Sequence, residues 1–279
     1  MNGNLDTRTV DGFGEEWSRF DQSGMAEDEI AEQFGRYFAV FPWDEMSANS
    51  VGFDLGCGSG RWAKIAAQRV GKLHCIDASS AALDVARKNL SGVANVEFHN
   101  ASVDSIPIED SSMDFGYSLG VLHHVPDTAG GIRACVNKLK PGAPFLVYLY
   151  YAFDNRPAWF RTVWKASDLL RRGVCSLPFG LKRIVTDAIA LFIYFPSAKL
   201  AKFLELIGFN VDVLPLSTYR KHSFYTMRTD ALDRFGTRLE QRFTREQIRE
   251  MMQSAGLGDI RFGDGTPYWC AVGIRVSDK

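Results

Sequence analysis

The chain has 279 residues, a formal net charge of −1 at pH 7 and a hydrophobic fraction of 46%. A chain of this length and composition can bury a full globular core, as one large domain or as one domain that carries an insertion. The near-zero net charge excludes a strong overall attraction to polyanions and counts against a dedicated nucleic-acid-binding protein.

The cysteines and the apolar runs predict a soluble, cytoplasmic protein. The five cysteines are scattered and contain no C-x-x-C pair, so we expect reduced thiols rather than disulfides or a metal site. The segment Met1–Asp11 lacks the apolar core of a signal peptide. The longest apolar run, Ile184–Phe195, is interrupted by polar residues and is predicted to be too short to span a bilayer.

Helices are predicted in the first fifty residues. Glu15–Phe20 and Asp28–Phe38 carry apolar residues at three- and four-residue spacing. Phe13, Trp17 and Phe20 would share one helical face. Packing of this face onto the rest of the protein is the simplest interpretation for each of the three residues.

Short β-type runs alternate with helical stretches between residues 50 and 151, which is typical of a parallel sheet covered by helices. The expected strands are Ser50–Leu55, Lys72–Asp77, Asn95–Ala101, Met113–Gly120 and Phe145–Tyr151. The expected helices are Gly60–Arg69, Ser80–Leu90 and Thr128–Leu139. The strand that begins at Phe145 is almost continuously apolar, which suits a strand buried on both faces.

Residues 152–240 differ in character and are predicted to form a mostly helical insertion. Their first part is rich in arginine and lysine with few acids, which leaves a solvated face, an anionic-substrate site and a lipid-contacting surface open. The apolar stretch Ile189–Phe195 is predicted to be a buried helix, in preference to a membrane contact. A later group of polar and aromatic residues indicates either a polar ligand or a buried ion-pair network; it contains His222, Tyr225, Arg228, Asp230, Asp233 and Arg234.

The alternating pattern resumes near the end of the chain. Thr244–Ala255 is predicted to be a helix with Thr244 as its N-cap. The strands Asp259–Phe262 and Trp269–Val276 are expected after it.

The segment 51–60 reads as an apolar strand, an aspartate, a glycine-rich turn and the start of a helix. Such a turn brings bare backbone close to a ligand and points helix N–H groups at it. The dinucleotide fingerprint needs its third glycine at position 61, which is Arg61 here. Asp54, directly beneath the turn, would repel a pyrophosphate but suits the ammonium group of an amino acid.

A second acid, Asp77, closes the next expected strand. An acid about 20 residues after a glycine turn is placed to accept hydrogen bonds from both hydroxyls of a ribose. The alternative is a residue that caps the following helix. With the glycine turn at the right distance, the ribose role is favoured.

These residues together resemble the class I S-adenosylmethionine-dependent methyltransferases, most closely their small-molecule and quinone-type branch. The resemblance rests on Asp54-x-Gly-x-Gly-x-Gly, Asp77, Asp114-Phe115, the run Leu119–Asp127 and Leu139-Lys140-Pro141-Gly142. It covers residues 51–151 well and 244–276 in outline. It implies a Rossmann-like α/β fold with seven mostly parallel strands in the order 3-2-1-4-5-7-6, the last of them antiparallel.

The resemblance also implies which residues bind the cofactor, S-adenosyl-L-methionine. The backbone around Gly56, Cys57 and Gly58, with Asp54 behind it, would hold the methionine part. Asp77 would bind the ribose. The remaining predicted contacts are Ala78 against the adenine, Ser102 and Val103 near its amino group, and the carbonyl of Leu119 toward the cofactor's ammonium. Ser102 departs from the family, where an acid is common at this position.

On the substrate side, His124 corresponds to the family's histidine before a Val-Pro-Asp turn. His124, or its neighbour His123, could take a proton from the acceptor during methyl transfer; the alternative is that both only shape the pocket. Tyr150 and Tyr151 would end the fifth strand at the cofactor edge. Substrate or lid residues are expected at Trp17, Phe20, Tyr150, Tyr151, His222, Tyr225 and Arg228.

We therefore expect an N-terminal helical lid (1–50), a cofactor-binding core (51–151 and 241–279) and a substrate-determining cap (152–240). The predicted function is methyl transfer to an oxygen or nitrogen of a small molecule such as a sugar, an amine or a secondary metabolite. A tRNA or other nucleic-acid methyltransferase and a non-catalytic S-adenosylmethionine-binding protein are the alternatives.

Overall fold

The computed structural model describes residues 3–22 and 24–277, and it divides the chain into two compact units. The first unit comprises Met1–Gln22, Ile30–Ala152 and Leu239–Lys279, and the second comprises Ser23–Glu29 and Phe153–Arg238. The predicted lid and core include the chain ends 1–2 and 278–279, which lie outside the described residues, as does residue 23.

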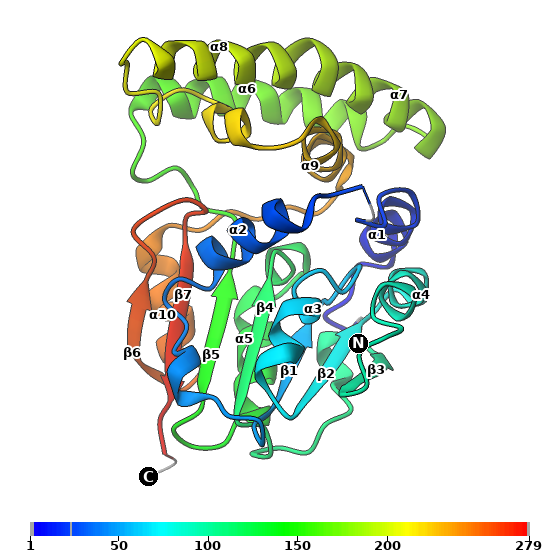
Figure 1. The fold of residues 1–279 in the computed structure, drawn as a ribbon, viewed down its shortest axis with the longest axis vertical. Helices are drawn as coiled ribbons and strands as arrows, with labels where there is room; N and C mark the ends of the chain where they lie inside the picture. Colours follow the sequence, from blue (N-terminus) through cyan, green and yellow to red (C-terminus); the bar gives the residue numbers. More distant parts are fainter. Residues whose placement is uncertain (1–2, 23, 278–279) are drawn as a thin grey trace. The chain divides into compact units, whose positions relative to one another are not determined.

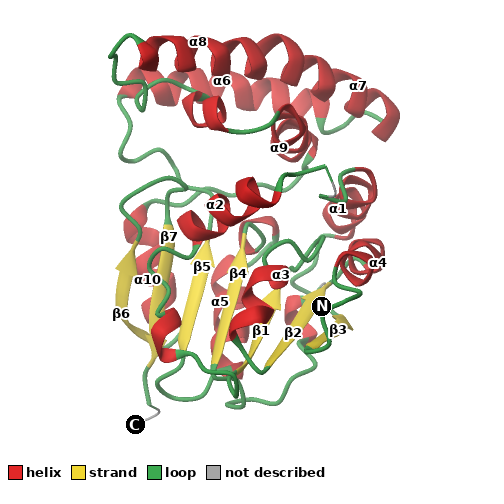
Figure 2. Ribbon diagram, in the orientation of Figure 1, coloured by secondary structure: helices red, strands yellow, loops and turns green. Residues whose placement is uncertain are grey.

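The first unit is built on a seven-stranded sheet (Figures 1 and 2). Its order is β3-β2-β1-β4-β5-β7-β6, and β7 runs antiparallel to both of its neighbours. This confirms the predicted Rossmann-like fold. The strands are β1 (Val51–Leu55), β2 (Lys72–Asp77), β3 (Val96–Asn100), β4 (Phe115–Leu119), β5 (Pro144–Tyr148), β6 (Leu257–Phe262) and β7 (Cys270–Arg275).

Helices cover both faces of this sheet. Side chains from α2, α3 and α4 form the core on one face, and side chains from α5 and α10 form it on the other. The helices are α1 (Thr7–Arg19), α2 (Glu27–Tyr37), α3 (Ala63–Ala66), α4 (Ser80–Asn89), α5 (Thr128–Lys138) and α10 (Arg245–Ser254). Short 3-10 turns occur at η1 (Trp43–Glu45), η2 (Ala67–Arg69), η3 (Val103–Ser105) and η4 (Leu122–His124).

Local sequence signals explain where several helices begin. Asp6 accepts a hydrogen bond from the backbone N–H of Thr9 and caps α1, and Asp127 caps α5 in the same way. Thr244 caps α10 as predicted, and Gln247 completes a reciprocal capping box with it. These caps satisfy backbone donors that the first helical turn would otherwise leave without partners.

The prediction that the fifth strand reaches Tyr151 is wrong, because β5 ends at Tyr148. The first helix also begins earlier than predicted, at Thr7 rather than Glu15, and α3 is limited to Ala63–Ala66. The ladder that β5 forms with β4 and β7 stops at Tyr148. Beyond it the chain pairs with Phe243 instead, whose N–H donates to the Tyr150 carbonyl at 2.9 Å. The backbone of Tyr150 and Tyr151 is therefore held by the segment that precedes α10.

The centre of the sheet is packed by two reciprocal glycine–phenylalanine pairs. Gly52 of β1 lies opposite Phe115 of β4, and Phe53 lies opposite Gly116. A Cβ atom added to either glycine would stand 2.3 Å from the ring of the phenylalanine opposite it. Each ring thus occupies the space over a neighbouring glycine, and the two rings lie in the cores on opposite faces.

The second unit is helical. Its helices are α6 (Ala158–Val174), α7 (Phe179–Ile189), the π-helical turn η5 (Ala190–Tyr194), α8 (Phe195–Leu206), the 3-10 turn η6 (Ser217–Lys221) and α9 (Phe224–Gly236). The helix α9 packs against α6 and α7. The core of the unit contains Val174, Ile189, Tyr194, Met227 and Phe235.

The prediction that Ile189–Phe195 is a buried helix is wrong in part. The longer run Ile184–Phe195 belongs to a continuous helix of 28 residues, Phe179–Leu206, which by length and composition alone could cross a membrane. The stretch Ile189–Phe195 is only partly buried, because Ile189 and Tyr194 face the core whereas the side chain of Phe192 is 73% exposed. A helix turns one side of such a run outward, and here Leu191, Phe192 and Ile193 are exposed by 47%, 73% and 47%.

The polar cluster of residues 222–234 is tied into internal ion pairs. Arg228 donates to both carboxylate oxygens of Asp187, at 2.8 and 2.9 Å. These bonds raise the pKa of Arg228 above its ordinary value. Asp230 accepts a hydrogen bond from the Tyr219 hydroxyl at 2.8 Å. Of the two interpretations left open above, the contacts support the ion-pair network.

The reciprocal packing of β1 and β4 yields a stability prediction. Replacing Gly52 with alanine should destabilise the protein by about 1–3 kcal/mol, because the added methyl group would overlap the Phe115 ring. Gly173→Ala is the matched control, since no atom lies within 4 Å of a Cβ at that helical position. Denaturant unfolding followed by circular dichroism measures both. Equal stability of the two variants would contradict the packing described here.

Candidate functional site

The glycine turn after β1 is fixed by the carboxyl end of β2. The backbone N–H groups of Gly56 and Cys57 donate to the Ile76 carbonyl at 2.7 and 3.1 Å. The N–H of Gly58 donates to the Asp77 carboxylate at 2.9 Å. Gly56, Gly58 and Gly60 all have positive φ (76°, 53° and 76°), a conformation that side chains other than hydrogen disfavour.

Asp77 is held by backbone on both sides. One carboxylate oxygen accepts the Gly58 N–H, and the other accepts the Ser79 N–H at 2.8 Å. Burial raises the pKa of Asp77, although these two hydrogen bonds act to lower it. Each carboxylate oxygen can accept more than one hydrogen bond. Asp77 can therefore hold the turn and still accept hydrogen bonds from a ligand.

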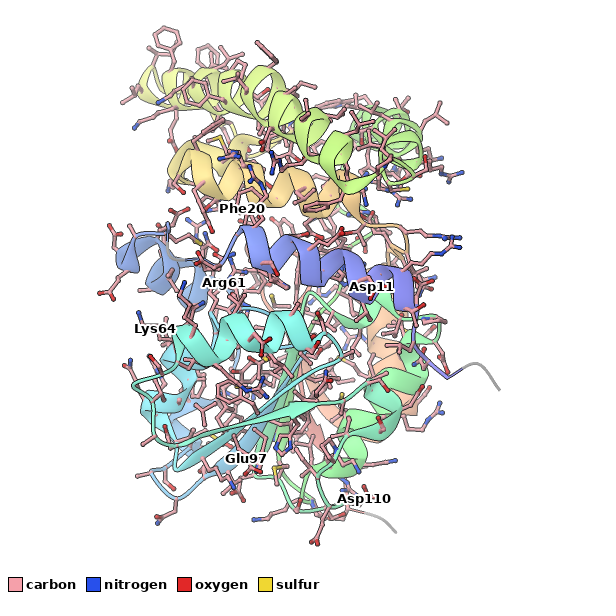
Figure 3. The ribbon with its side chains drawn as sticks, turned by 90° about the vertical axis from the view of Figure 1, so that its right-hand side faces the viewer. Asp11, Phe20, Arg61, Lys64, Glu97 and Asp110 are labelled. Carbon is pink, nitrogen blue, oxygen red and sulfur yellow. The ribbon has the colours of Figure 1, made fainter. Side chains whose placement is uncertain are left out.

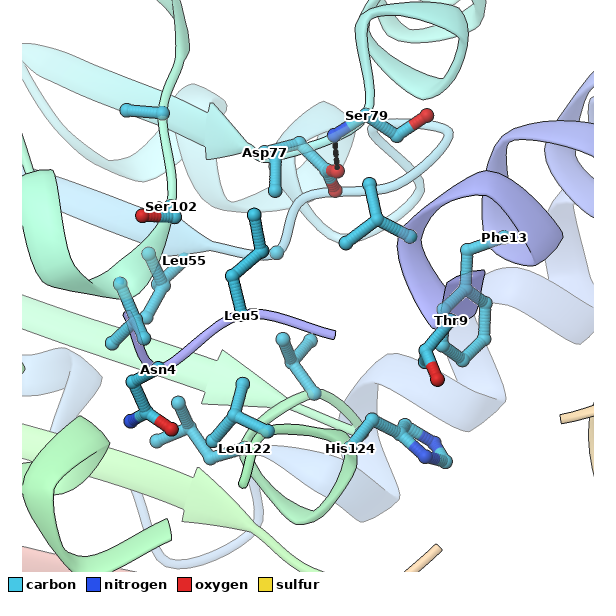
Figure 4. Close-up of a pocket in the computed structure, with 18 of the residues that line it drawn as sticks. Asn4, Leu5, Thr9, Phe13, Leu55, Asp77, Ser79, Ser102, Leu122 and His124 are labelled. Atoms are coloured by element: carbon cyan, nitrogen blue, oxygen red, sulfur yellow. Dashed lines mark hydrogen bonds between the residues drawn. The ribbon is translucent and has the colours of Figure 1, made fainter. Parts of the chain in front are cut away.

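A pocket opens at the carboxyl ends of the strands, beside the glycine turn (Figure 4). Ligands of open α/β sheets bind at this edge, outside the carboxyl ends of the strands. Of the predicted residues, the pocket is lined by Gly56, Asp77, Ala78, Ser102, Val103, Leu119, Trp17 and His124. The structure thus brings together residues that lie more than 100 positions apart in the sequence.

The N-terminal helix α1 forms one wall of the pocket. It packs along α4 (Figure 3), and Phe13 and Trp17 both line the pocket. A Cβ atom on Gly58 would lie 3.0 Å from the Trp17 indole. The indole therefore lies directly against the glycine turn, and only glycine at position 58 leaves room for it.

Asn4 and Leu5 also line the pocket and were not predicted from the sequence. The Asn4 side chain forms two hydrogen bonds of 2.6 Å with the backbone of Asp127, one donated to the carbonyl and one accepted from the N–H. Leu5 extends into the pocket near Asp77 and Leu55 (Figure 4). A polar N-terminal segment carries no periodicity, so no sequence signal marks these residues.

Asp54 lies behind the glycine turn and does not line the pocket. Its side chain is buried, with only 1% of the residue exposed. Burial raises its pKa from 3.8 to about 8; a hydrogen bond with Tyr117 acts in the opposite direction, and the negative charge of Asp77 adds to the rise. This carboxyl group has no cation among the groups that determine its pKa.

The two histidines occupy different environments. His124 lines the pocket, and its Nδ1 lies 2.6 Å from the Leu239 carbonyl, so Nδ1 carries the proton and donates it. His123 is fully buried, its Nδ1 accepts the Tyr150 N–H, and its ring stacks on Tyr150 at 3.8 Å. Burial holds the pKa of His123 well below its ordinary value. His123 is thus a neutral packing residue.

The remaining predicted substrate and lid residues do not line the pocket. Phe20 is buried and does not line the pocket. Tyr150 packs on His123, and Tyr151 packs on the rings of Tyr268 and Trp269. Neither tyrosine lines the pocket, because β5 ends before them. The predicted substrate residues His222, Tyr225 and Arg228 belong to the second unit.

One group of side chains among residues 3–22 and 24–277 could hold a metal ion, although none was predicted. His74, Glu97 and His99 place their ligand atoms within 4.8 Å of one another on β2 and β3. The two rings are already joined by a 2.9 Å hydrogen bond, and Lys72 pairs with Glu97 at 2.6 Å. The ammonium group of Lys72 fills the place of a cation at this cluster.

Comparison with known sequences points to one domain family. Residues 53–147 match the family described as methyltransferase domain. The chain is 37% identical over 135 residues to a ubiquinone biosynthesis O-methyltransferase of Pseudomonas aeruginosa, which covers 46% of this chain and 57% of the relative. It is 33% identical over 119 residues to the enzyme of that name from Acinetobacter baylyi, covering 40% and 48%. The chain thus spans about half the length of the curated relatives it matches.

Solved structures share the fold. A Haloferax volcanii methyltransferase in complex with the activator Trm112 superposes with a TM-score of 0.56 at 14% identity, over 95% of this chain and 98% of that one. The YcgJ protein of Bacillus subtilis superposes with a TM-score of 0.53 at 14% identity, over 91% and 100%. The strand order, the glycine turn with its two acids and the family match identify residues 53–147 as a methyltransferase domain with the class I S-adenosylmethionine-dependent fold.

Proposed function

We propose that this protein transfers the methyl group of S-adenosylmethionine to an oxygen or nitrogen of a small molecule. The observation that carries the proposal is a pocket with α1 as one wall. It is lined by Asp77, by Gly56 of the glycine turn and by His124. The names of the relatives, which are O-methyltransferases, favour oxygen as the acceptor atom. The free cysteines, four of them buried, support a cytoplasmic location.

The cofactor fits the residues present. The ribose hydroxyls would bind the carboxylate of Asp77, and the adenine would lie among Ala78, Ser102 and Val103, which line the same pocket. The methionine part would lie along Gly56, where a Cβ atom would overlap the Val121 side chain. Leu119, the last residue of β4, lines the same pocket as Gly56. When bound, the cofactor supplies an electrophilic methyl group on a sulfonium sulfur.

Asp54 supplies an independent indication of a cationic ligand. A buried carboxyl group whose pKa has risen to about 8 lacks a countercharge. A positive charge bound near the glycine turn would favour its ionised form, and the ammonium of an amino-acid moiety has that charge. Nicotinamide dinucleotides would bring a pyrophosphate to the same turn, where an ionised Asp54 would repel it.

His124 and α1 would act on the acceptor. The Leu239 carbonyl fixes the proton on Nδ1, so Nε2 has the lone pair that a general base needs. Phe13 packs on the His124 ring at 4.9 Å and, with Trp17, would exclude water from the pocket. Methyl transfer is an in-line displacement, in which positioning of the acceptor can supply much of the rate.

Two other functions are tested together with this one. Protein incubated with S-adenosylmethionine carrying a radioactive methyl group would be offered the small-molecule fraction and the RNA fraction of one cell extract. We expect label in the small-molecule fraction alone. Label in the RNA would favour a nucleic-acid methyltransferase. Tight cofactor binding without transfer to either fraction would favour a non-catalytic binding protein.

Replacing Asp77 with alanine should weaken binding of the demethylated cofactor by about 1.5–3 kcal/mol, through the loss of charge-assisted hydrogen bonds. Titration calorimetry measures the change. Asp84→Ala is the control. Asp84 is an exposed acid of α4 that pairs with its helical neighbour Arg87 and does not line the pocket. Unchanged affinity of the Asp77 variant would place the cofactor elsewhere.

Asp54 should make the stability of the cofactor-free protein depend on pH. Its native pKa of about 8 exceeds the ordinary value of 3.8, so the native state holds a proton that the unfolded chain has lost. The free energy of unfolding should therefore fall as pH rises from about 4 to about 8 and level off above that range. Asp54→Asn should remove this component, as urea unfolding at several pH values would show. If the difference in free energy of unfolding between the wild type and Asp54→Asn did not change with pH, Asp54 would be ionised in the native state, contrary to this account.

The role of His124 is separable from its packing. In His124→Asn the amide can still donate to the Leu239 carbonyl, but the basic nitrogen is gone. If His124 is the general base, kcat should fall by about 10²–10⁴ with little change in cofactor affinity, and the acid limb of the pH–rate profile should disappear. An unchanged kcat would leave His124 with a shaping role only.

A further inference from the structure

Exposed apolar side chains are concentrated in the second unit. Within the described residues, all large apolar side chains that are exposed lie between Trp159 and Phe224, except Leu5 and Val276. Single exposed apolar residues are ordinary on soluble proteins, whereas a contiguous group marks a contact surface. The densest part of this group is the 28-residue helix Phe179–Leu206, which comprises α7, η5 and α8 (Figure 1).

This helix has two opposite apolar faces. Its inner face is buried: α7 and η5 pack on α9, and α8 packs on η6. The buried residues of this face are Thr186, Ala190, Tyr194, Ala198 and Ala201. Steps of four residues drift around an ideal α-helix, which repeats every 3.6 residues. The wider π-helical turn η5 offsets this drift, so the buried residues of α7 and α8 fall on one side of the helix.

No other described element of the unit covers the outer face of this helix. We define the outer face by the exposed side chains of Ile184, Phe192, Leu200, Phe203 and Leu206. Their exposed fractions range from 57% for Leu200 to 77% for Leu206. This face is apolar over the full length of the helix. Its side chains add nothing to the core of the unit, whose apolar cluster lies on the other side.

The charge around the outer face is positive. Residues 158–206 contain eight lysines and arginines and three acids, Asp168, Asp187 and Glu205. Asp168 is bound by Arg171 and Arg172 at 2.7 and 3.1 Å, Asp187 is bound by Arg228, and Glu205 is bound by Arg220 at 2.9 Å. Each acidic charge is therefore compensated inside the unit, which leaves the excess charge of this segment positive.

Two exposed lysines lie on the helix among its apolar side chains. The ammonium of Lys199 lies 5.1 Å from the centre of the Phe195 ring, and Lys202 is exposed one turn before Leu206. Lysines of this kind cover apolar surface with their methylene chains and keep their charge in the polar layer. An apolar helical face bordered by lysine and arginine is the signature of a helix that lies in a membrane interface.

We propose that the outer face of helix 179–206 docks on the surface of a bilayer that contains anionic lipids. The helix would lie in the plane of the interface rather than cross it, because its inner face is packed on Met227 and Ala231 and the Asp187–Arg228 pair would otherwise enter hydrocarbon. A second copy of the chain is a poorer occupant, since a symmetric contact would bring the same lysines together.

Co-sedimentation of the full chain with vesicles tests this proposal, and it does not depend on the methyl acceptor. We expect binding to vesicles of phosphatidylcholine with phosphatidylglycerol, weaker binding to phosphatidylcholine alone, and loss of binding as salt is raised. The double variant Phe192→Ser/Phe203→Ser should bind about tenfold more weakly or not at all, since it removes two inserted rings. Lys199→Gln/Lys202→Gln should lose the preference for the anionic vesicles.

The matched control is Val276→Ser, an exposed apolar residue of the first unit that should leave vesicle binding unchanged. Circular dichroism should show all variants folded, because the replaced side chains are exposed. Failure of the wild-type protein to bind the anionic vesicles, or equal binding by the Phe192/Phe203 variant, would overturn the proposal. So would a dimer in the absence of lipid that the same substitutions convert to monomer, because the face would then be a subunit interface.

Discussion

The contact between the glycine turn and the end of β2 is the constraint on which the rest of the site depends. Three consecutive N–H groups of the turn, those of Gly56, Cys57 and Gly58, are bound by the Ile76 carbonyl and the Asp77 carboxylate. Asp77 is thereby fixed relative to the turn before any ligand binds. A site whose donors and acceptors are already oriented loses less entropy when it binds.

The same turn determines what lies above and below it. The Trp17 indole can rest on Gly58 only because no Cβ is present, and Val121 approaches Gly56 for the same reason. Below the turn, Asp54 is shielded from water, and this burial raises the pKa of its carboxyl group to about 8. The fixed position of Asp77 and the packing of Trp17 and Val121 against the turn are therefore consequences of one backbone conformation.

Local patterns predicted a parallel sheet covered by helices, and the family resemblance implied its strand order. The glycine turn, Asp77 and the same resemblance predicted eight of the residues that line the pocket. The sequence could not place Asn4 and Leu5, whose position depends on hydrogen bonds to Asp127, 123 residues away. Tyr150 was misjudged because the end of β5 is set by pairing with Phe243, which apolar patterning does not encode.

The second unit shows a different limit of sequence analysis. An apolar run such as Ile189–Phe195 has the same composition whether a helix, water or lipid faces it, and only the packing of α9 decides which residues are covered. Conversely, the polar cluster of residues 222–234 that suggested a ligand is used in internal contacts, such as the Arg228–Asp187 pair and the Tyr219–Asp230 hydrogen bond. The apolar outer face, rather than the polar cluster, is therefore the feature of this unit that calls for a partner.

A crystal structure of the protein with S-adenosylhomocysteine bound tests the central claim most directly. The account predicts that the ribose hydroxyls bind the Asp77 carboxylate and that the amino-acid end lies along the glycine turn beneath Trp17. A ligand bound away from Asp77, or a pocket that stays closed at saturating ligand, would contradict it.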